Sequence, residues 1–161
     1  MSKKSKIEIT VEVFENQSEL PKEIKELMDR AKHARKEAYA PYSHFNVGAA
    51  ILLDSGEITI GNNQENAAYP SGLCAERVAI FHCGAAFPNQ IIKAMAISAS
   101  SETHKVEEPI GSCGACRQSL SEYEQKQKSP IAIYFMGETG KIVKVDSVKD
   151  LLPLGFDAKY L

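Results

Sequence analysis

The sequence lacks an excess of charge of either sign. Its 161 residues include 19 Lys and Arg against 21 Asp and Glu, so the formal net charge is only -2 at pH 7. A protein that binds a nucleic-acid backbone or an anionic membrane needs a strongly basic surface, which this balance does not favour. We therefore expect neither nucleic acid nor a membrane among its partners.

Long apolar runs are absent too. No stretch approaches the roughly 20 residues that a helix needs to cross a bilayer. The first ten residues, MSKKSKIEIT, lack the apolar centre of a secretory signal. These absences predict a cytoplasmic protein.

Internal repeats, linkers and low-complexity segments are also missing, and the length suits one domain with one core. Residues 1–6 are rich in Lys and Ser, after which Ile and Val alternate with polar residues over 7–13. That period of two is typical of a half-buried strand. We interpret residues 1–20 as a tail with an added edge strand, and residues 21–161 as a single domain.

Within that domain the hydrophobic period switches between that of a helix and that of a strand. Helices are predicted from Pro21 to before Pro41, over Cys74–Ala86, and from near Cys113 to a solvated run at 124–128. Strands are predicted over 48–53, 57–60, 94–99, 131–136 and 141–145, with a hairpin turn at 54–56. Such alternation favours an α/β layered fold.

Cysteine is scarce, with only four in the chain. In a reducing cytoplasm these thiols are poor candidates for disulfides, so the pair Cys113-x-x-Cys116 points to metal or redox chemistry. On that spacing alone a catalytic metal site, a redox pair and a structural zinc site are evenly balanced interpretations.

Cys74 favours a metal. One helical turn presents Cys113 and Cys116 to a single ion, and Cys74 supplies a third thiolate from the start of another helix, where the helix dipole favours negative charge. A redox pair does not need Cys74, and a structural zinc site normally has a fourth protein ligand. We therefore expect one Zn²⁺ per subunit, with the fourth position left open for water as in catalytic sites.

The other candidate ligands fit less well. His33, His44, His82 and His104 are scattered and are expected to be surface or packed residues. Cys83 lies on the far side of its predicted helix from Cys74, which favours a buried apolar role.

Two arginines lie beside the predicted ligands: Arg77 one turn from Cys74, and Arg117 next to Cys116. Three thiolates overcharge a zinc ion, and hydrogen bonds from a guanidinium to the sulfurs restore part of its Lewis acidity. We predict that at least one of these arginines donates such a bond.

Glu76 lies two residues after Cys74, within reach of the open metal position. Zinc lowers the pKa of bound water from about 16 to about 7, and a nearby carboxylate can take the water proton and later return it. We therefore predict Glu76 as the catalytic proton carrier. The alternative is a helix-start glutamate stabilised by the helix dipole.

Together, the motifs CAER at 74–77 and CGACRQ at 113–118 resemble those of the small homotetrameric cytidine deaminases, zinc enzymes with three cysteine ligands. The resemblance covers about residues 21 to 161 and includes four further blocks in family order: APYSHF (40–45), VGAA (47–50), ENAAYP (65–70) and LLP (151–153). It implies a three-layer α/β/α sandwich around a mixed five-stranded sheet, here with an extra N-terminal strand. One departure is Ser112, where the family usually has Pro.

The resemblance also implies a nucleoside site. Asn63 and Glu65 would hold the ribose hydroxyl, and an analogue without it would leave them unpaired at a cost of about 1 to 3 kcal/mol. Phe45 would pack on the pyrimidine, and the backbone at Ala75 would read the ring edge. Spacing alone leaves Phe45 as an ordinary core residue.

Further substrate-binding residues implied by the resemblance are Asn66, Tyr69 and Phe156. Phe156 would enter the site of a neighbouring subunit, because the family forms homotetramers with shared active sites. Spacing alone again leaves Phe156 as a core residue.

The implied activity is the hydrolytic deamination of cytidine and deoxycytidine to uridine and deoxyuridine, with release of ammonia, in pyrimidine salvage. Two alternatives stay open: a blasticidin S-type nucleoside deaminase, which Glu65-Asn66-Ala67 disfavours, and a structural zinc module without enzyme activity.

Overall fold

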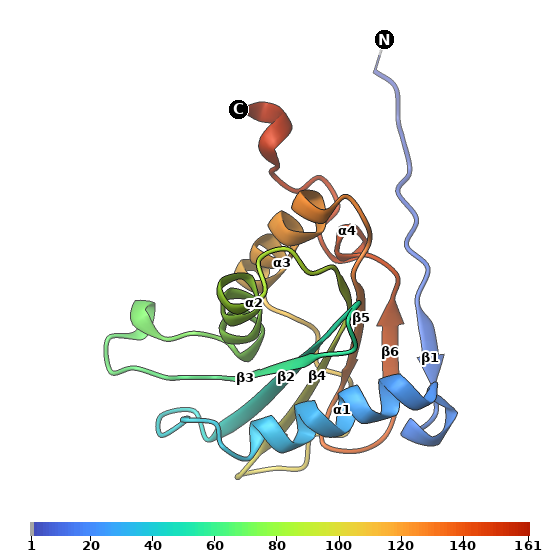
Figure 1. Ribbon diagram of the computed structural model, residues 1–161. Coiled ribbons are helices and arrows are strands. Elements are labelled where there is room, and N and C mark those ends of the chain that lie inside the picture. Colours follow the sequence, from blue (N-terminus) through green and yellow to red (C-terminus); the bar gives the residue numbers. More distant parts are fainter. Residues whose placement is uncertain (1) are drawn as a thin grey trace.

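A computed structural model gives the structure of residues 2–161, which contain six strands and four α-helices (Figure 1). The strands are β1 (Glu12–Phe14), β2 (Phe45–Leu53), β3 (Ile58–Asn62), β4 (Ile92–Ser101), β5 (Ala132–Met136) and β6 (Ile142–Val145). The helices are α1 (Lys22–Arg35), α2 (Ala75–Ala86), α3 (Gly114–Gln127) and α4 (Val148–Leu151). Three single 3₁₀ turns lie at Gln17–Glu19, Tyr69–Ser71 and Ala158–Tyr160.

All six strands form one mixed sheet in the order β1-β6-β5-β4-β2-β3. Only the β4–β5 pair is parallel, and α3 lies in the crossover between these two strands, as a parallel connection requires. The antiparallel β2–β3 hairpin closes through Asp54, Ser55 and Gly56, where Gly56 has a positive φ of 88°. The α/β class with a mixed sheet is therefore confirmed.

The side chains of β2 alternate between two buried clusters, one on each face of the sheet. Ala50 and Leu52 pack with residues of α1, whereas Ala49, Ile51 and Leu53 pack with residues of α2, α3 and α4. Figure 1 shows the same arrangement, with α1 on one face and the other helices opposite. Helices therefore cover both faces of the sheet.

Two glycines let the helices approach the sheet closely. A Cβ built on Gly48 would lie 2.1 Å from the Ala31 carbonyl oxygen of α1, and one on Gly61 would lie 2.5 Å from the Ala79 backbone nitrogen of α2. Any side chain at either position would push a helix away from the sheet. The position of α2, which carries part of the candidate site, depends on Gly61.

The structure shortens two predicted elements. The first helix ends at Arg35 because the next three N–H groups donate to carbonyls three residues earlier, which tightens the chain into turns. The strand expected over 7–13 is reduced to Glu12–Phe14, paired with β6 at the sheet edge. None of the four helices is long and apolar enough to span a membrane, within the part of the chain that the structure describes.

Glu124 differs from the solvated residue expected in the polar run at 124–128. Its side chain is 5 % exposed, and its carboxylate accepts hydrogen bonds from Ile131 N (2.8 Å), Val148 N (2.8 Å) and Ser147 Oγ (2.7 Å). The carboxylate thus joins the end of α3 to the start of α4 and to the segment that enters β5.

We predict that Glu124→Ala lowers the free energy of unfolding by about 3 kcal/mol, because two buried N–H groups lose their acceptor. Urea unfolding at fixed protein concentration measures this change. Glu122→Ala, at an exposed position of the same helix, is the matched control and should change the value by less than about 0.5 kcal/mol. Equal effects of the two substitutions would contradict the assigned role.

Candidate metal centre and active site

The amino ends of α2 and α3 carry three of the four cysteines. Cys74 is the N-cap of α2, Cys113 is the N-cap of α3, and Cys116 lies in the first turn of α3. The Cys113 sulfur accepts a hydrogen bond from the Cys116 backbone N–H at 3.4 Å. Each helix end therefore directs backbone N–H groups and the positive end of its dipole toward the thiols.

The three sulfurs suit a single zinc ion. They all lie within 4.8 Å of one another, with 3.7 Å between the sulfurs of Cys74 and Cys113 and 3.3 Å between those of Cys113 and Cys116. A tetrahedral ion with zinc–sulfur bonds of about 2.3 Å separates its sulfurs by about 3.8 Å, close to these distances. No fourth Cys, His, Asp or Glu joins this group within residues 2–161.

The thiols of the cluster shift one another's pKa values. The pKa of Cys74 is lowered to about 6, chiefly by its hydrogen bond with Cys116 and partly by the charge of Arg77. The same hydrogen bond and burial raise the pKa of Cys116. Metal binding would displace the protons of these thiols.

Glu76 lies in the first turn of α2, two residues after Cys74, and is only 4 % exposed. Burial of a carboxylate is costly unless polar or charged groups compensate. Here the positive end of the α2 dipole provides part of that compensation. Ala75, which begins α2, is fully buried, and its N–H belongs to the helix-start groups without an intrahelical acceptor.

Neither predicted arginine donates a hydrogen bond to sulfur in this structure. The Arg117 guanidinium donates to the carbonyls of Ser112 (2.8 Å) and Leu151 (2.9 Å), whereas Arg77 lies over the ring of Phe81 at 5.9 Å. A carbonyl oxygen is a stronger hydrogen-bond acceptor than the sulfur of a neutral thiol, so the Arg117 guanidinium binds these two carbonyls. Arg117 thus braces the segment before Cys113 against the end of α4.

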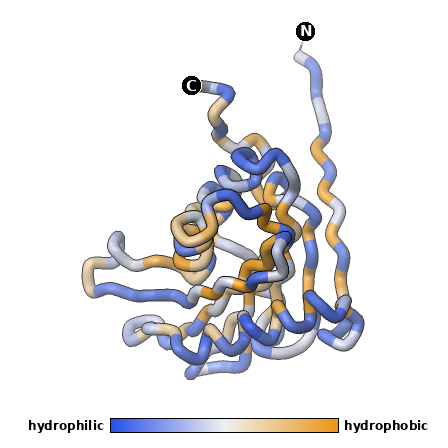
Figure 2. The backbone as a smooth tube through the Cα atoms, viewed as in Figure 1, coloured by the Kyte–Doolittle hydropathy of each residue, from blue (hydrophilic) through white to orange (hydrophobic). Residues whose placement is uncertain are grey.

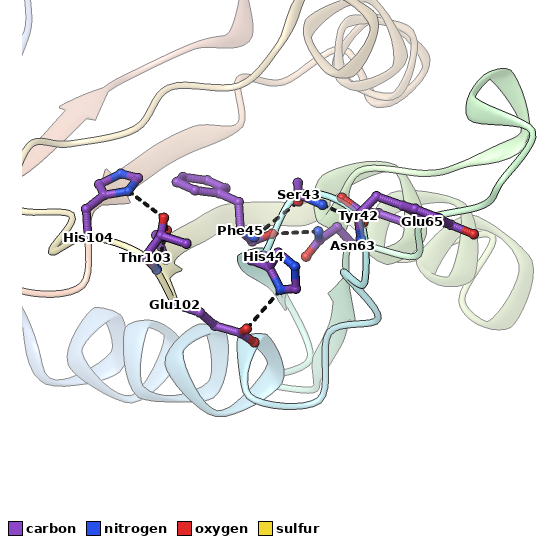
Figure 3. A network of polar contacts seen from close by, with 10 residues as sticks. Tyr42, Ser43, His44, Phe45, Asn63, Glu65, Glu102, Thr103 and His104 are labelled. Carbon is purple, nitrogen blue, oxygen red and sulfur yellow. Dashed lines mark hydrogen bonds and ion pairs between the residues drawn. The ribbon is translucent and has the colours of Figure 1, made fainter.

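An open cleft of about 400 Å³ leads to Cys74. Its walls come from the turn before β2 and from the loop between β3 and α2. Figure 3 shows the polar side chains that join these two segments. The lining residues are Tyr42, Ser43, Asn63, Gln64, Glu65, Asn66, Tyr69, Gly72, Leu73 and Cys74.

Asn63 ties the loop after β3 to the start of β2. Its Oδ1 accepts from Val47 N at 2.7 Å. Its Nδ2 donates to the Phe45 carbonyl at 2.9 Å (Figure 3). The amide has a second N–H and a second acceptor lone pair. Asn63 therefore binds the backbone of Phe45, which is not among the residues that line the cleft, and keeps hydrogen-bonding capacity for a ligand.

Glu65 is held by the turn before β2. One carboxylate oxygen accepts from Tyr42 N at 2.9 Å and from Ser43 N at 3.2 Å (Figure 3). Hydrogen bonds from the Ser43 side chain and from these two backbone groups lower the pKa of the carboxyl. Glu65 is therefore ionised at neutral pH, with its other oxygen free to accept a hydroxyl.

The remaining predicted residues divide into two groups. Asn66 accepts from Ala68 N at 2.8 Å, and Tyr69 contacts Tyr42 with ring centroids 5.9 Å apart, both on the cleft wall. Phe156 lies outside this cleft, 57 % exposed and stacked on Tyr160 at 5.6 Å.

Sequence reasoning did not single out Tyr42 and Ser43 as functional residues. Their backbone N–H groups hold Glu65, and their side chains line the cleft. The sequence Pro41-Tyr42-Ser43 indicates a turn. It does not indicate that the backbone N–H groups of this turn bind Glu65, because backbone donors leave no side-chain signature in a sequence.

Comparison with known proteins matches this chain to one family. The family model described as "Cytidine and deoxycytidylate deaminase zinc-binding region" matches residues 21–130. A cytidine deaminase of Sporosarcina psychrophila is 37 % identical over 139 residues, which are 86 % of this chain and 95 % of that protein. One of Halalkalibacterium halodurans is 36 % identical over 133 residues, 83 % of this chain and 93 % of that protein.

The fold has relatives among solved structures. The crystal structure of cytidine deaminase from Burkholderia pseudomallei superposes with a TM-score of 0.70 at 37 % identity, covering 81 % of this chain and 97 % of that one. The fold, the three thiols and the adjacent carboxylate define a zinc-dependent hydrolytic deaminase. Within that class, the chain belongs to the cytidine deaminase family.

We predict that Cys113→Ser reduces bound zinc from near one ion per chain to almost none, because a neutral hydroxyl is a poor zinc ligand. Elemental analysis of protein purified with zinc and then dialysed measures the content. Cys83→Ser is the matched control: Cys83 is buried in the core cluster and lies outside the thiol group, so zinc should be retained. Zinc loss in both variants, or in neither, would contradict the assigned ligands.

Proposed function

We propose that the chain catalyses hydrolytic deamination of cytidine and deoxycytidine to uridine and deoxyuridine, with release of ammonia. The observation that carries this proposal is the meeting of three thiols and the buried Glu76 at two helix starts, beside a cleft that contains Glu65. The relatives named as cytidine deaminases support the same substrate class.

Cys74, Cys113 and Cys116 would hold the zinc ion. When bound, zinc supplies a Lewis acid that lowers the pKa of a water to about 7. Because these three thiols are the only members of the candidate ligand group among residues 2–161, a tetrahedral ion held by them would keep one position for that water.

Glu76 would move the protons. Its carboxylate takes one proton from the attacking water and gives it to the ring nitrogen next to the attacked carbon. It then carries the second water proton to the exocyclic amine. The new carbon–oxygen bond replaces the carbon–nitrogen bond, and ammonia leaves. Water and cytidine therefore account for every atom of uridine and ammonia.

The cleft residues would select a nucleoside over a free base. The free oxygen of Glu65 accepts from a sugar hydroxyl, and the remaining N–H of Asn63 donates to the same group. A bound base without the sugar leaves both groups unpaired, at a cost of about 1 to 3 kcal/mol. Phe45 would pack on the pyrimidine, and the Ala75 backbone, Asn66 and Tyr69 would complete the contacts.

We further propose that the enzyme is a homotetramer with shared active sites. Large apolar side chains are exposed near the carboxyl end, with Leu154 92 % and Phe156 57 % exposed. Such exposure is unfavourable unless another surface covers these side chains. Phe156 would then contribute to the site of a neighbouring subunit.

In the cell, this activity would belong to pyrimidine salvage in the cytoplasm. Strands β2 to β6 would correspond to the five-stranded family sheet, and β1 would be the extra N-terminal strand. Arg77 and Arg117 would act around the metal ligands, Arg77 through its charge near Cys74 and Arg117 by bracing the segment before Cys113.

We predict that Glu76→Gln lowers kcat for cytidine by roughly 10² to 10⁴-fold, because the amide cannot carry a proton. The loss of cytidine absorbance measures turnover, and elemental analysis checks that zinc is retained. Glu122→Gln, on the exposed side of α3, should leave kcat unchanged. If the wild-type, zinc-loaded protein leaves cytidine unchanged, the proposed activity is wrong; if Glu76→Gln retains full turnover, the proposed proton carrier is wrong.

A further inference from the structure

The amino-terminal arm, defined here as residues 7–11, extends away from the body of the molecule (Figure 1). It continues β1 backward but pairs with no other strand among residues 2–161. Its apolar side chains Ile7, Ile9 and Val11 are 45 to 56 % exposed. Figure 2 shows hydrophobic and hydrophilic positions alternating along this extended segment.

The chain's own sheet cannot extend along the arm. β1 pairs with β6 through Phe14↔Ile142, Val13↔Val143 and Glu12↔Lys144. The next pairs would need Val145 and Asp146, but the following residue, Ser147, is already the N-cap of α4. Because β6 ends at Val145 and Ser147 already caps α4, residues 7–10 of the arm have no strand of this chain to pair with.

The composition of the arm is that of a paired strand. Three β-branched apolar residues share one face, and Glu8 and Thr10 share the other. An exposed edge with this pattern is a template for pairing with another strand, which satisfies the backbone groups and covers the apolar face.

We propose that this arm pairs antiparallel with the same arm of a second copy of the chain, about a two-fold axis at Ile9. In this register Ile9 lies opposite Ile9 of the second copy, Ile7 opposite Val11, Glu8 opposite Thr10, and Lys6 opposite Glu12. The apolar residues then form one continuous stripe, and two Lys6–Glu12 pairs of opposite charge flank it.

Charge selects this register from its neighbours. A shift of the axis to Glu8 would place Glu8 opposite Glu8, and a shift to Thr10 would place Glu8 opposite Glu12. Like charges directly opposite destabilise a sheet, whereas the Ile9-centred register has none. Registers centred between two residues put apolar side chains opposite polar ones and break the stripe. An axis at Ile7 also avoids like charges, with Lys6 opposite Glu8, but it places Ile9 opposite Ser5 and breaks the stripe. The Ile9-centred register is therefore the one that combines a continuous apolar stripe with opposite charges at both ends.

The consequence is a two-stranded ribbon that links the edge strands β1 of two molecules. This contact does not involve the cleft or the metal ligands, so it goes beyond the proposed activity. The partner that covers the exposed arm is the identical arm of a second molecule, paired in a defined geometry.

Disulfide trapping tests the pairing on the zinc-loaded, full-length protein. Opposed residues of an antiparallel pair have Cα atoms about 4.5 to 5.5 Å apart, within the range that a disulfide spans. We expect Ile9→Cys to form a covalent dimer under mild oxidation, seen by intact mass and reversed by reductant. The wild-type protein should not link, because its cysteines are metal ligands or buried.

The matched variant is Thr10→Cys, whose two copies would be diagonal neighbours about 7 to 8 Å apart and so poorly placed for a disulfide. The dimer yield for Ile9→Cys should exceed that for Thr10→Cys on the order of tenfold. Adding Lys6→Glu to Ile9→Cys should lower the yield several-fold by placing Glu opposite Glu12.

Three results would overturn the proposal. No dimer from Ile9→Cys would mean that the arm pairs elsewhere, for example on the open edge of β3 in another subunit, or not at all. Equal yields from both cysteine variants would indicate random collision. If Lys6→Glu leaves the dimer yield of Ile9→Cys unchanged, charge does not select the proposed register.

Discussion

The site depends on one constraint. The amino ends of two helices meet at the same end of the sheet, where β3 and β4 finish. β2 is antiparallel to both β3 and β4, so these two strands run in the same direction and their carboxyl ends share an edge. The chain leaves β3 for α2 and β4 for α3. Both helices pack on the same face and start near that edge, where their dipoles favour the clustered thiolates.

The cleft depends on the same edge. Asn63 and Glu65 follow directly after β3, and their side chains bind the backbone around the start of β2: Asn63 at Phe45 and Val47, Glu65 at Tyr42 and Ser43. Gly61, which β3 presents to α2, lets that helix lie close enough for Cys74 to form one end of the cleft. Strand direction, helix approach and loop polarity therefore act together to place polar groups beside the metal ligands.

Local signals in the sequence were sufficient for the α/β class, the helix starts at Cys74 and Cys113, and the thiol cluster, because cap position and ligand spacing are properties of short segments. Features that depend on distant partners were not predictable. Arg117 binds the carbonyls of Ser112 and Leu151 instead of sulfur, and Glu124 is buried by three donors from later segments. The predicted strand over 7–13 is cut short: β1 pairs with β6 no further than Lys144, and because β6 ends at Val145, residues 7–10 have no strand of this chain to pair with.

X-ray absorption at the zinc edge tests the central claim most directly, since it counts the atoms that the two helix ends supply. For the zinc-loaded protein we expect three sulfur neighbours at about 2.3 Å and one nitrogen or oxygen neighbour at about 2.0 Å, as in a catalytic site with one open position. Four sulfur neighbours, or a shell without sulfur, would contradict the assignment of Cys74, Cys113 and Cys116 as the only protein ligands.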